Sequence, residues 1–147
     1  MAEQYDYVIV GAGTAGCVLA NRLTACGKYT VCLLEAGPSD WNPMIHIPAG
    51  FMKTIANPSV NWLYQSEPCP GTNGRTIPMP RGKVIGGSSS INGLIFSRGQ
   101  KMDFDVWAQK GNRGWSYDDV LPYFRRYESH ESSVDNKFRG QSGEMTI

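Results

Sequence analysis

The sequence predicts an α/β fold in which a parallel sheet carries flanking helices. Two observations predict it. A short apolar run at residues 7–10 leads directly into the glycine pattern Gly11-Ala12-Gly13-Thr14-Ala15-Gly16, and a second apolar run follows at residues 30–34. Strand, glycine turn, helix and strand in this order form one βαβ unit. The pattern is typical of Rossmann-like FAD/NAD(P)-binding sheets, and we expect that sheet to be incomplete in this chain.

Residues 1–36 are expected to contain this first unit. Residues 7–10 and 30–34 predict buried parallel strands, because short unbroken apolar runs suit strands covered on both faces. Residues 15–25 have helical spacing, and Gly27 suits the end of that helix. The residues expected on its apolar face are Val18, Leu19 and Leu23.

The three glycines of the pattern have separate roles in holding a dinucleotide. Gly11 allows a sharp turn, Gly13 lets the backbone approach a pyrophosphate, and Gly16 lets the helix pack closely on the strand. Amides at the start of the helix would then face the anion. Glu35 ends the second strand, where a carboxylate can bind ribose hydroxyls and repel the 2′-phosphate of NADP. The alternative for Glu35 is a solvated residue at the start of a loop.

Residues 37–80 form the second expected part, an ordered excursion or lid. Its prolines rule out long regular elements, while apolar residues such as Trp41, Phe51 and Trp62 give it anchors, so it is not a flexible linker. Eight of the nine prolines of the chain lie here: Pro38, Pro43, Pro48, Pro58, Pro68, Pro70, Pro78 and Pro80.

Residues 81–147 form the third expected part: a loop on the flavin side, then helices and the start of a substrate domain. A second glycine-rich stretch, residues 82–93, suits a loop whose amides and hydroxyls hold a polar ligand. Because a flavin must be held at both ends, two such loops favour FAD over a nicotinamide. Residues 102–110 predict a short helix. Ser116 and Asp119 predict a capping box that begins a second helix, which ends at about Glu128. Residues 144–147 predict a strand.

Composition excludes several classes of protein. Hydrophobic residues make up 41% and charged residues 18%, and 14 basic and 13 acidic residues give a net charge of +1. We therefore expect a packed domain with no nucleic-acid partner. No apolar run is long enough to span a bilayer and no signal peptide is evident, so we expect a cytoplasmic protein, free or at a membrane surface. The four cysteines lack metal spacing, so no metal site is predicted, and Cys17, Cys26 and Cys32 are expected to fill the core.

The stretch from Arg81 to Gly99 resembles the first signature of the glucose–methanol–choline (GMC) oxidoreductases. Residues 105–107 and 114–124 are similar to the usual continuation of that family, and the bacterial choline and alcohol dehydrogenases are the most similar branch. The resemblance implies FAD, a small alcohol substrate, and oxidation of its CH–OH group by hydride transfer to the flavin. It also implies residues at the cofactor: Gly11, Gly13, Thr14, Ala15 and Gly16 at the pyrophosphate; Glu35 and Ala36 at the adenosine; Trp62 near the adenine; Arg81, Gly82 and Val84 bordering FAD; and Gly87, Ser88, Asn92, Gly93, Leu94 and Ile95 along the flavin.

The resemblance also implies what this chain lacks. Family members are several times longer and carry a catalytic His and its partner near the C-terminus, so we assign no catalytic residue and expect the remaining polypeptide as a partner. His46 is expected among apolar residues and His130 in an exposed stretch. Some members attach FAD through a His just before the matching Asn. Ile91 occupies that position, which predicts dissociable FAD. The alternatives are a flavin lyase or decarboxylase of the same family, a non-catalytic flavin-binding fragment and, more remotely, an NAD-dependent dehydrogenase.

Overall fold

The computed structural model describes residues 3–132 and 137–147. Its contacts divide the chain into two compact units, Met1–Ile95 and Phe96–Ile147. In the part of the chain that the structure describes, no helix combines the length and apolar character needed to cross a bilayer.

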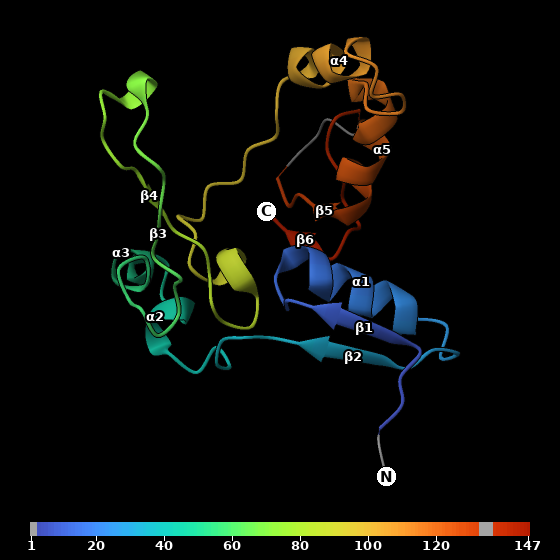
Figure 1. The fold of residues 1–147 in the computed structure, drawn as a ribbon. Helices are drawn as coiled ribbons and strands as arrows, with labels where there is room; N and C mark the ends of the chain where they lie inside the picture. Colours follow the sequence, from blue (N-terminus) through green and yellow to red (C-terminus); the bar gives the residue numbers. More distant parts are fainter. Residues whose placement is uncertain (1–2, 133–136) are drawn as a thin grey trace. The chain divides into compact units, whose positions relative to one another are not determined.

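The first unit begins with the predicted βαβ arrangement. Strands β1 (Tyr7–Val10) and β2 (Val31–Leu34) pair in parallel, and helix α1 (Thr14–Thr24) packs on both of them (Figure 1). Asp6 joins the start of the strands, because its carboxylate accepts hydrogen bonds from the amide and hydroxyl of Thr30, which lower the pKa of Asp6. Gly27 has a φ of +68° just beyond α1, as predicted for the residue that ends the helix. The mixed helix and strand fold is therefore confirmed.

The prediction that both strands are buried is wrong. Val8 and Val10 are 60% and 84% exposed, and Val18 and Leu19 of α1 are also exposed. The reason is that β1 and β2 form a two-stranded sheet, so the described residues supply no further strand or layer to cover it. Helix α1 instead approaches the strands through the buried Gly16.

The cysteines do not all fill the core. Cys17 and Cys32 are half-buried, and the Cys17 thiol donates to the carbonyl oxygen of Ala12. Cys26 is exposed, so the prediction is wrong for this residue, which lies in the turn after α1 and has no layer above it.

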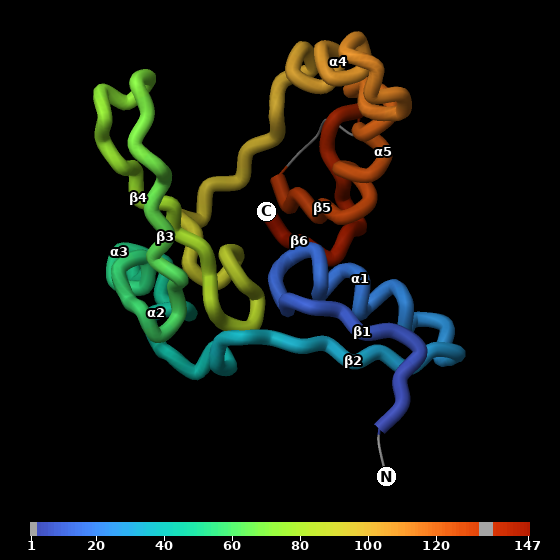
Figure 2. Tube along the Cα trace, viewed as in Figure 1, coloured from blue at the N-terminus to red at the C-terminus, as the bar shows by residue number. Residues whose placement is uncertain are grey.

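Residues 37–80 fold into short elements, as their prolines predict. The longest are the four-residue helices α2 (Pro43–His46) and α3 (Phe51–Thr54). Two-residue strands β3 (Tyr64–Gln65) and β4 (Pro78–Met79) pair antiparallel below an extended loop (Figure 2). The 3₁₀ helices are η1 (Pro48–Gly50), η2 (Pro70–Thr72) and, in the second glycine stretch, η3 (Gly87–Ser90). Val60, Val84 and Ile91 form a buried cluster against which Ile45 packs.

The second unit contains both predicted helices, α4 (Lys101–Gln109) and α5 (Tyr117–Tyr127). Ser116 and Asp119 form the predicted capping box of α5. The ring of Phe104 packs against aromatic rings of both helices. Strands β5 (Glu128–Ser129) and β6 (Met145–Thr146) pair in parallel, which places a strand in the predicted segment 144–147.

Both histidines differ from expectation. His46 is not enclosed by apolar residues: its side chain is 59% exposed, because Nε2 lies 2.7 Å from the backbone oxygen of Asp40 in the preceding loop. His130 is half-buried, because its backbone amide bonds to Gly140 and draws it against that segment. The neighbouring Glu128 is fully buried and forms ion pairs with Arg98 and Arg139.

Candidate functional site

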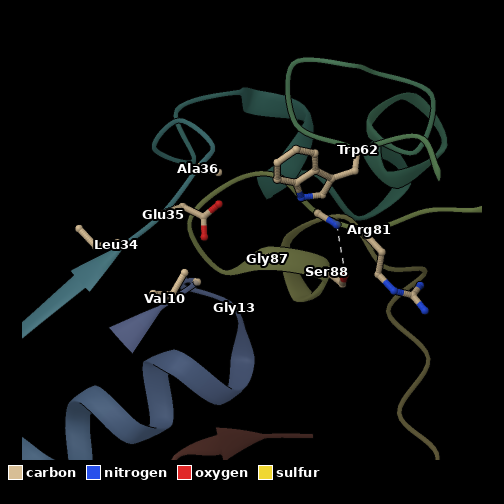
Figure 3. A pocket seen from close by; sticks show the side chains of 11 residues that line it. Val10, Gly13, Leu34, Glu35, Ala36, Trp62, Arg81, Gly87 and Ser88 are labelled. Atoms are coloured by element: carbon tan, nitrogen blue, oxygen red, sulfur yellow. Dashed lines mark hydrogen bonds between the residues drawn. The ribbon is translucent and has the colours of Figure 1, made fainter. Parts of the chain in front are cut away.

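A cavity of about 560 Å³ lies at the carboxyl ends of β1 and β2. This edge is where ligands bind in open parallel sheets. Figure 3 shows the carboxylate of Glu35 on one side of the cavity and the indole of Trp62 on the other. The lining residues are Val10, Gly11, Gly13, Leu34, Glu35, Ala36, Trp62, Arg81, Gly82, Gly87 and Ser88.

The first glycine turn forms one wall of the cavity. Gly11 has a φ of +97°, which favours glycine, and Gly13 caps the start of α1. A side chain on Gly16 would overlap the carbonyl oxygen of Gly11, so helix and turn can approach this closely only with glycine there. The first amides of a helix have no partner within it and can bind an anion. The start of α1 beside the cavity therefore suits a pyrophosphate.

The second glycine stretch is bonded directly to the first. The amide of Gly86 donates to the carbonyl oxygen of Ala12 at 2.8 Å, and Gly13 and Gly86 form a parallel bridge. Gly87 touches Gly13 so closely that a Cβ on Gly87 would lie 2.7 Å from the Gly13 Cα. The hydroxyls of Thr14 and Ser89 lie 2.5 Å apart. Both glycine loops thus belong to one site.

Glu35 holds the first glycine turn in shape. Its Oε2 accepts from the amide of Ala12 at 2.8 Å, and its Oε1 accepts from the amide of Gly37 at 2.9 Å. A carboxylate oxygen has more than one acceptor position, so both oxygens can still accept hydroxyl groups from the cavity. Glu35 can therefore serve the turn and a ribose together.

The opposite wall consists of two adjacent backbone segments. The amide of Trp62 donates to the carbonyl oxygen of Arg81 at 2.9 Å. The Trp62 indole stacks on Tyr64 with centroids 5.8 Å apart, and the ammonium of Lys83 lies 4.8 Å from the indole centroid. Below them, the hydroxyl of Ser88 accepts from the amide of Gly82 at 3.1 Å (Figure 3). An aromatic surface beside a cation suits a planar ligand group.

The cavity brings together nine of the 17 residues named from the sequence and leaves eight outside its lining. Val84 is fully buried in the apolar cluster. The Asn92 carboxamide accepts from the amide of Leu94, which has a φ of +59°. Leu94 and Ile95 are exposed. The other four residues outside the lining are Thr14, Ala15, Gly16 and Gly93.

Sequence reasoning missed two lining residues, Val10 and Leu34. Each is the last residue of its strand, so the rule that ligands bind at carboxyl ends could have found them. Among residues 3–132 and 137–147, no three His, Cys, Asp or Glu side chains lie close enough to share a metal ion. The cavity combines backbone amides, a carboxylate and an indole, groups that suit a pyrophosphate, hydroxyls and a planar ring.

Comparison with known proteins identifies the family of this site. Residues 5–147 match the family described as GMC oxidoreductase. The chain is 48% identical over 144 residues to an oxygen-dependent choline dehydrogenase of Rhizobium rhizogenes, covering 98% of this chain and 26% of that protein. It is 43% identical over 143 residues to an alcohol dehydrogenase [acceptor] of Pseudomonas putida, covering 97% and 26%.

Solved structures agree with this match. The crystal structure of pyridoxine 4-oxidase from Mesorbium loti superposes with a TM-score of 0.87 at 37% identity, over 97% of this chain and 28% of that one. A formate oxidase of Aspergillus oryzae RIB40, solved in a study of FAD modification, superposes with a TM-score of 0.83 at 32% identity, over 97% and 26%.

The chain belongs to the GMC oxidoreductase family. It matches choline and alcohol dehydrogenases and oxidases over 97–98% of its length, but it spans only about a quarter of the curated relatives.

Replacing Gly13 with valine is expected to remove ligand binding while leaving the first unit folded. A Cβ on Gly13 has room, since its nearest neighbour would be the Gly87 Cα at 3.9 Å, but the branched side chain would stand where an anion must meet the backbone. Flavin absorbance of the purified protein should fall by roughly a hundredfold or more, on the scale expected for lost charge-assisted hydrogen bonds. Gly71→Val is the matched control, because Gly71 lies outside the cavity and also has room for a Cβ. Normal flavin content in Gly13→Val would remove Gly13 from the site.

Proposed function

We propose that this chain is the FAD-binding N-terminal part of a flavin-dependent oxidoreductase that oxidises an alcohol to an aldehyde or ketone. The observation that carries the proposal is the direct bonding of two glycine loops at a cavity that also contains Glu35. The printed names of the relatives, choline dehydrogenase and alcohol dehydrogenase, support an alcohol as the substrate.

The residues present fit FAD. Backbone amides at Gly13 and the start of α1 would bind the pyrophosphate, and Gly13 leaves the backbone accessible there. Glu35 and Ala36 would bind the adenosine, with Trp62 beside the adenine and Arg81 and Gly82 at the border. Residues 87–95, which include Asn92, Gly93, Leu94 and Ile95, would line the flavin.

FAD, when bound, supplies the acceptor for the hydride of the alcohol carbon. We propose that it is bound non-covalently, because Ile91, at the position of the family's attachment histidine, is an apolar side chain that is 3% exposed. We do not assign Glu35 as the base that takes the alcohol proton, because it is bonded to amides at the first glycine turn and is proposed to bind the ribose, at the opposite end of FAD from the flavin. We therefore assign that base to the remaining polypeptide, which completes the active site.

We also keep the division into residues 1–36, 37–80 and 81–147 as a proposal, with residues 37–80 as an ordered excursion or lid.

Competition with the two halves of FAD tests this proposal. We propose that this cavity holds the adenosine and pyrophosphate, so ADP should displace FAD from the intact apo-protein. FMN at the same concentration should displace it much less. Binding of FAD is measured by the loss of its fluorescence. Displacement by FMN but not by ADP would contradict the placement of the adenosine half in this cavity. Failure of the wild-type protein to bind FAD would contradict the proposed function itself.

A further inference from the structure

One buried polar side chain beside the cavity has no role in the proposed cofactor contacts. Asn61 is 2% exposed and does not line the cavity. A buried carboxamide costs free energy unless its donor and acceptor groups are satisfied, so its bonds show what it stabilises. Both polar atoms of the Asn61 side chain are bonded. Its Nδ2 donates to the carbonyl oxygen of Ile55 at 2.6 Å, and its Oδ1 accepts from the amides of Leu63 and Arg81, each at 3.0 Å.

These bonds join the two segments of the cavity wall. Leu63 follows Trp62 directly, and Arg81 lies on the neighbouring segment, so one oxygen atom links both. Backbone bonds extend the pairing on either side: Trp62 donates to Arg81, and Lys83 donates to Val60. The bond from Nδ2 to Ile55 then ties this pair of segments to the end of α3.

The backbone beside Trp62 is strained. Leu63 has a φ of +54°, a conformation that a branched side chain adopts only when its surroundings enforce it. The bond from the Leu63 amide to the Asn61 side chain closes an Asx turn, which fixes the peptide group between Trp62 and Leu63. Without that acceptor, this peptide group would be free to turn, and Trp62 would turn with it.

We infer that Asn61 is a positioning residue that holds Trp62 and Arg81 in the wall of the cavity. The inference rests on the proposed function, because it takes FAD to be the ligand that meets this wall. Asn61 would touch no part of FAD and would act through the two residues that do.

Asn61→Leu is the direct test. It keeps the size of the side chain and removes all three bonds, so FAD affinity of the intact apo-protein should fall roughly tenfold or more, on the scale of lost buried hydrogen bonds. Fluorine NMR of fluorotryptophan-labelled protein should show the Trp62 resonance, assigned with Trp62→Phe, shifted or broadened. Thr54→Val is the matched control. Thr54 is equally buried, and its hydroxyl donates to Phe51 within α3 and not to either wall segment, so this change should lower stability while leaving FAD affinity and the Trp62 resonance unchanged.

Asn61→Asp keeps the test valid if Asn61→Leu does not fold. Aspartate retains acceptors for Leu63 and Arg81 but sets a second oxygen against the carbonyl oxygen of Ile55, so it should lower stability, mainly at Ile55, and keep the Trp62 resonance and most of the FAD affinity. The inference is overturned if Asn61→Leu binds FAD as the wild type does, or if Asn61→Asp displaces the Trp62 resonance. A wild-type protein that does not bind FAD would instead contradict the proposed function.

Discussion

Replacing Gly87 with alanine is expected to separate the two glycine loops and abolish FAD binding. The new Cβ would lie 2.7 Å from the Gly13 Cα, a distance that real Cβ atoms essentially never show. The new Cβ is fixed to its own backbone and the Gly13 Cα is a backbone atom, so neither can rotate away, and the loops must move apart. Gly87 also has a φ of +58°, which adds about 1–2 kcal/mol of strain for a residue with a Cβ. The purified variant should be colourless and should unfold at a lower temperature than the wild type.

Gly74→Ala separates the two causes of this effect. Gly74 has a φ of +71°, so alanine is strained there to a similar degree, but a Cβ at Gly74 meets nothing within 4 Å. Thermal unfolding should show a modest loss of stability in Gly74→Ala, with normal flavin absorbance. Equal flavin content in the two variants would mean that contact between the loops is not needed for binding.

Replacing Glu35 with alanine is expected to have a large effect on both stability and binding, because it removes two roles at once. The Ala12 amide would lose its acceptor, and Ala12 is only 1% exposed, so no water can replace it easily. An unsatisfied buried amide costs about 1–3 kcal/mol of stability. Loss of the acceptor for the ribose should weaken FAD binding by about 1–3 kcal/mol, or roughly tenfold to a hundredfold.

Two further variants define the role of Glu35. Glu35→Gln keeps one acceptor oxygen but points an NH₂ group at an amide, so its FAD affinity should lie between that of the wild type and that of Glu35→Ala. Glu67→Ala removes an exposed carboxylate outside the cavity and should change neither FAD affinity nor stability. Titration with FAD measures the affinity of all three variants as apo-proteins. Wild-type affinity in Glu35→Ala would exclude Glu35 from the site.

Much of the secondary structure in both units could be predicted because its signals are local. Apolar runs predicted β1 and β2, Gly27 predicted the end of α1, and Ser116 with Asp119 predicted the start of α5. Each signal lies within a few residues of the feature that it predicts. Exposure was not predictable in this way. Burial of Val8 and Val10 depends on what lies across the sheet, and an apolar strand has the same sequence whether or not its neighbour is present in the chain.

Nine residues of the cavity lining could be predicted from the sequence, but the hydrogen bonds that join its segments could not. Glycine spacing and Glu35 predicted where an adenosine would bind, yet no pattern predicted that Gly86 would bond to Ala12 or that Asn61 would bond to the amides of Leu63 and Arg81. These bonds join segments far apart in the sequence, and their partners are backbone groups, which every residue carries. Side-chain identity therefore gives almost no information about them.

The bonding between the two glycine loops also has a consequence for the order of folding. Thr14 and Ser89, which meet there, are 75 residues apart, whereas β1, α1 and β2 are neighbours in the chain. Closing so long a loop costs conformational entropy before any contact compensates for it, so local elements should form first. The first βαβ unit can then form early, but the cavity comes into being only after residues 37–80 have folded. Acquisition of the cofactor would accordingly mark a late step in maturation, and slowing the folding of the proline-rich segment should delay the appearance of bound flavin.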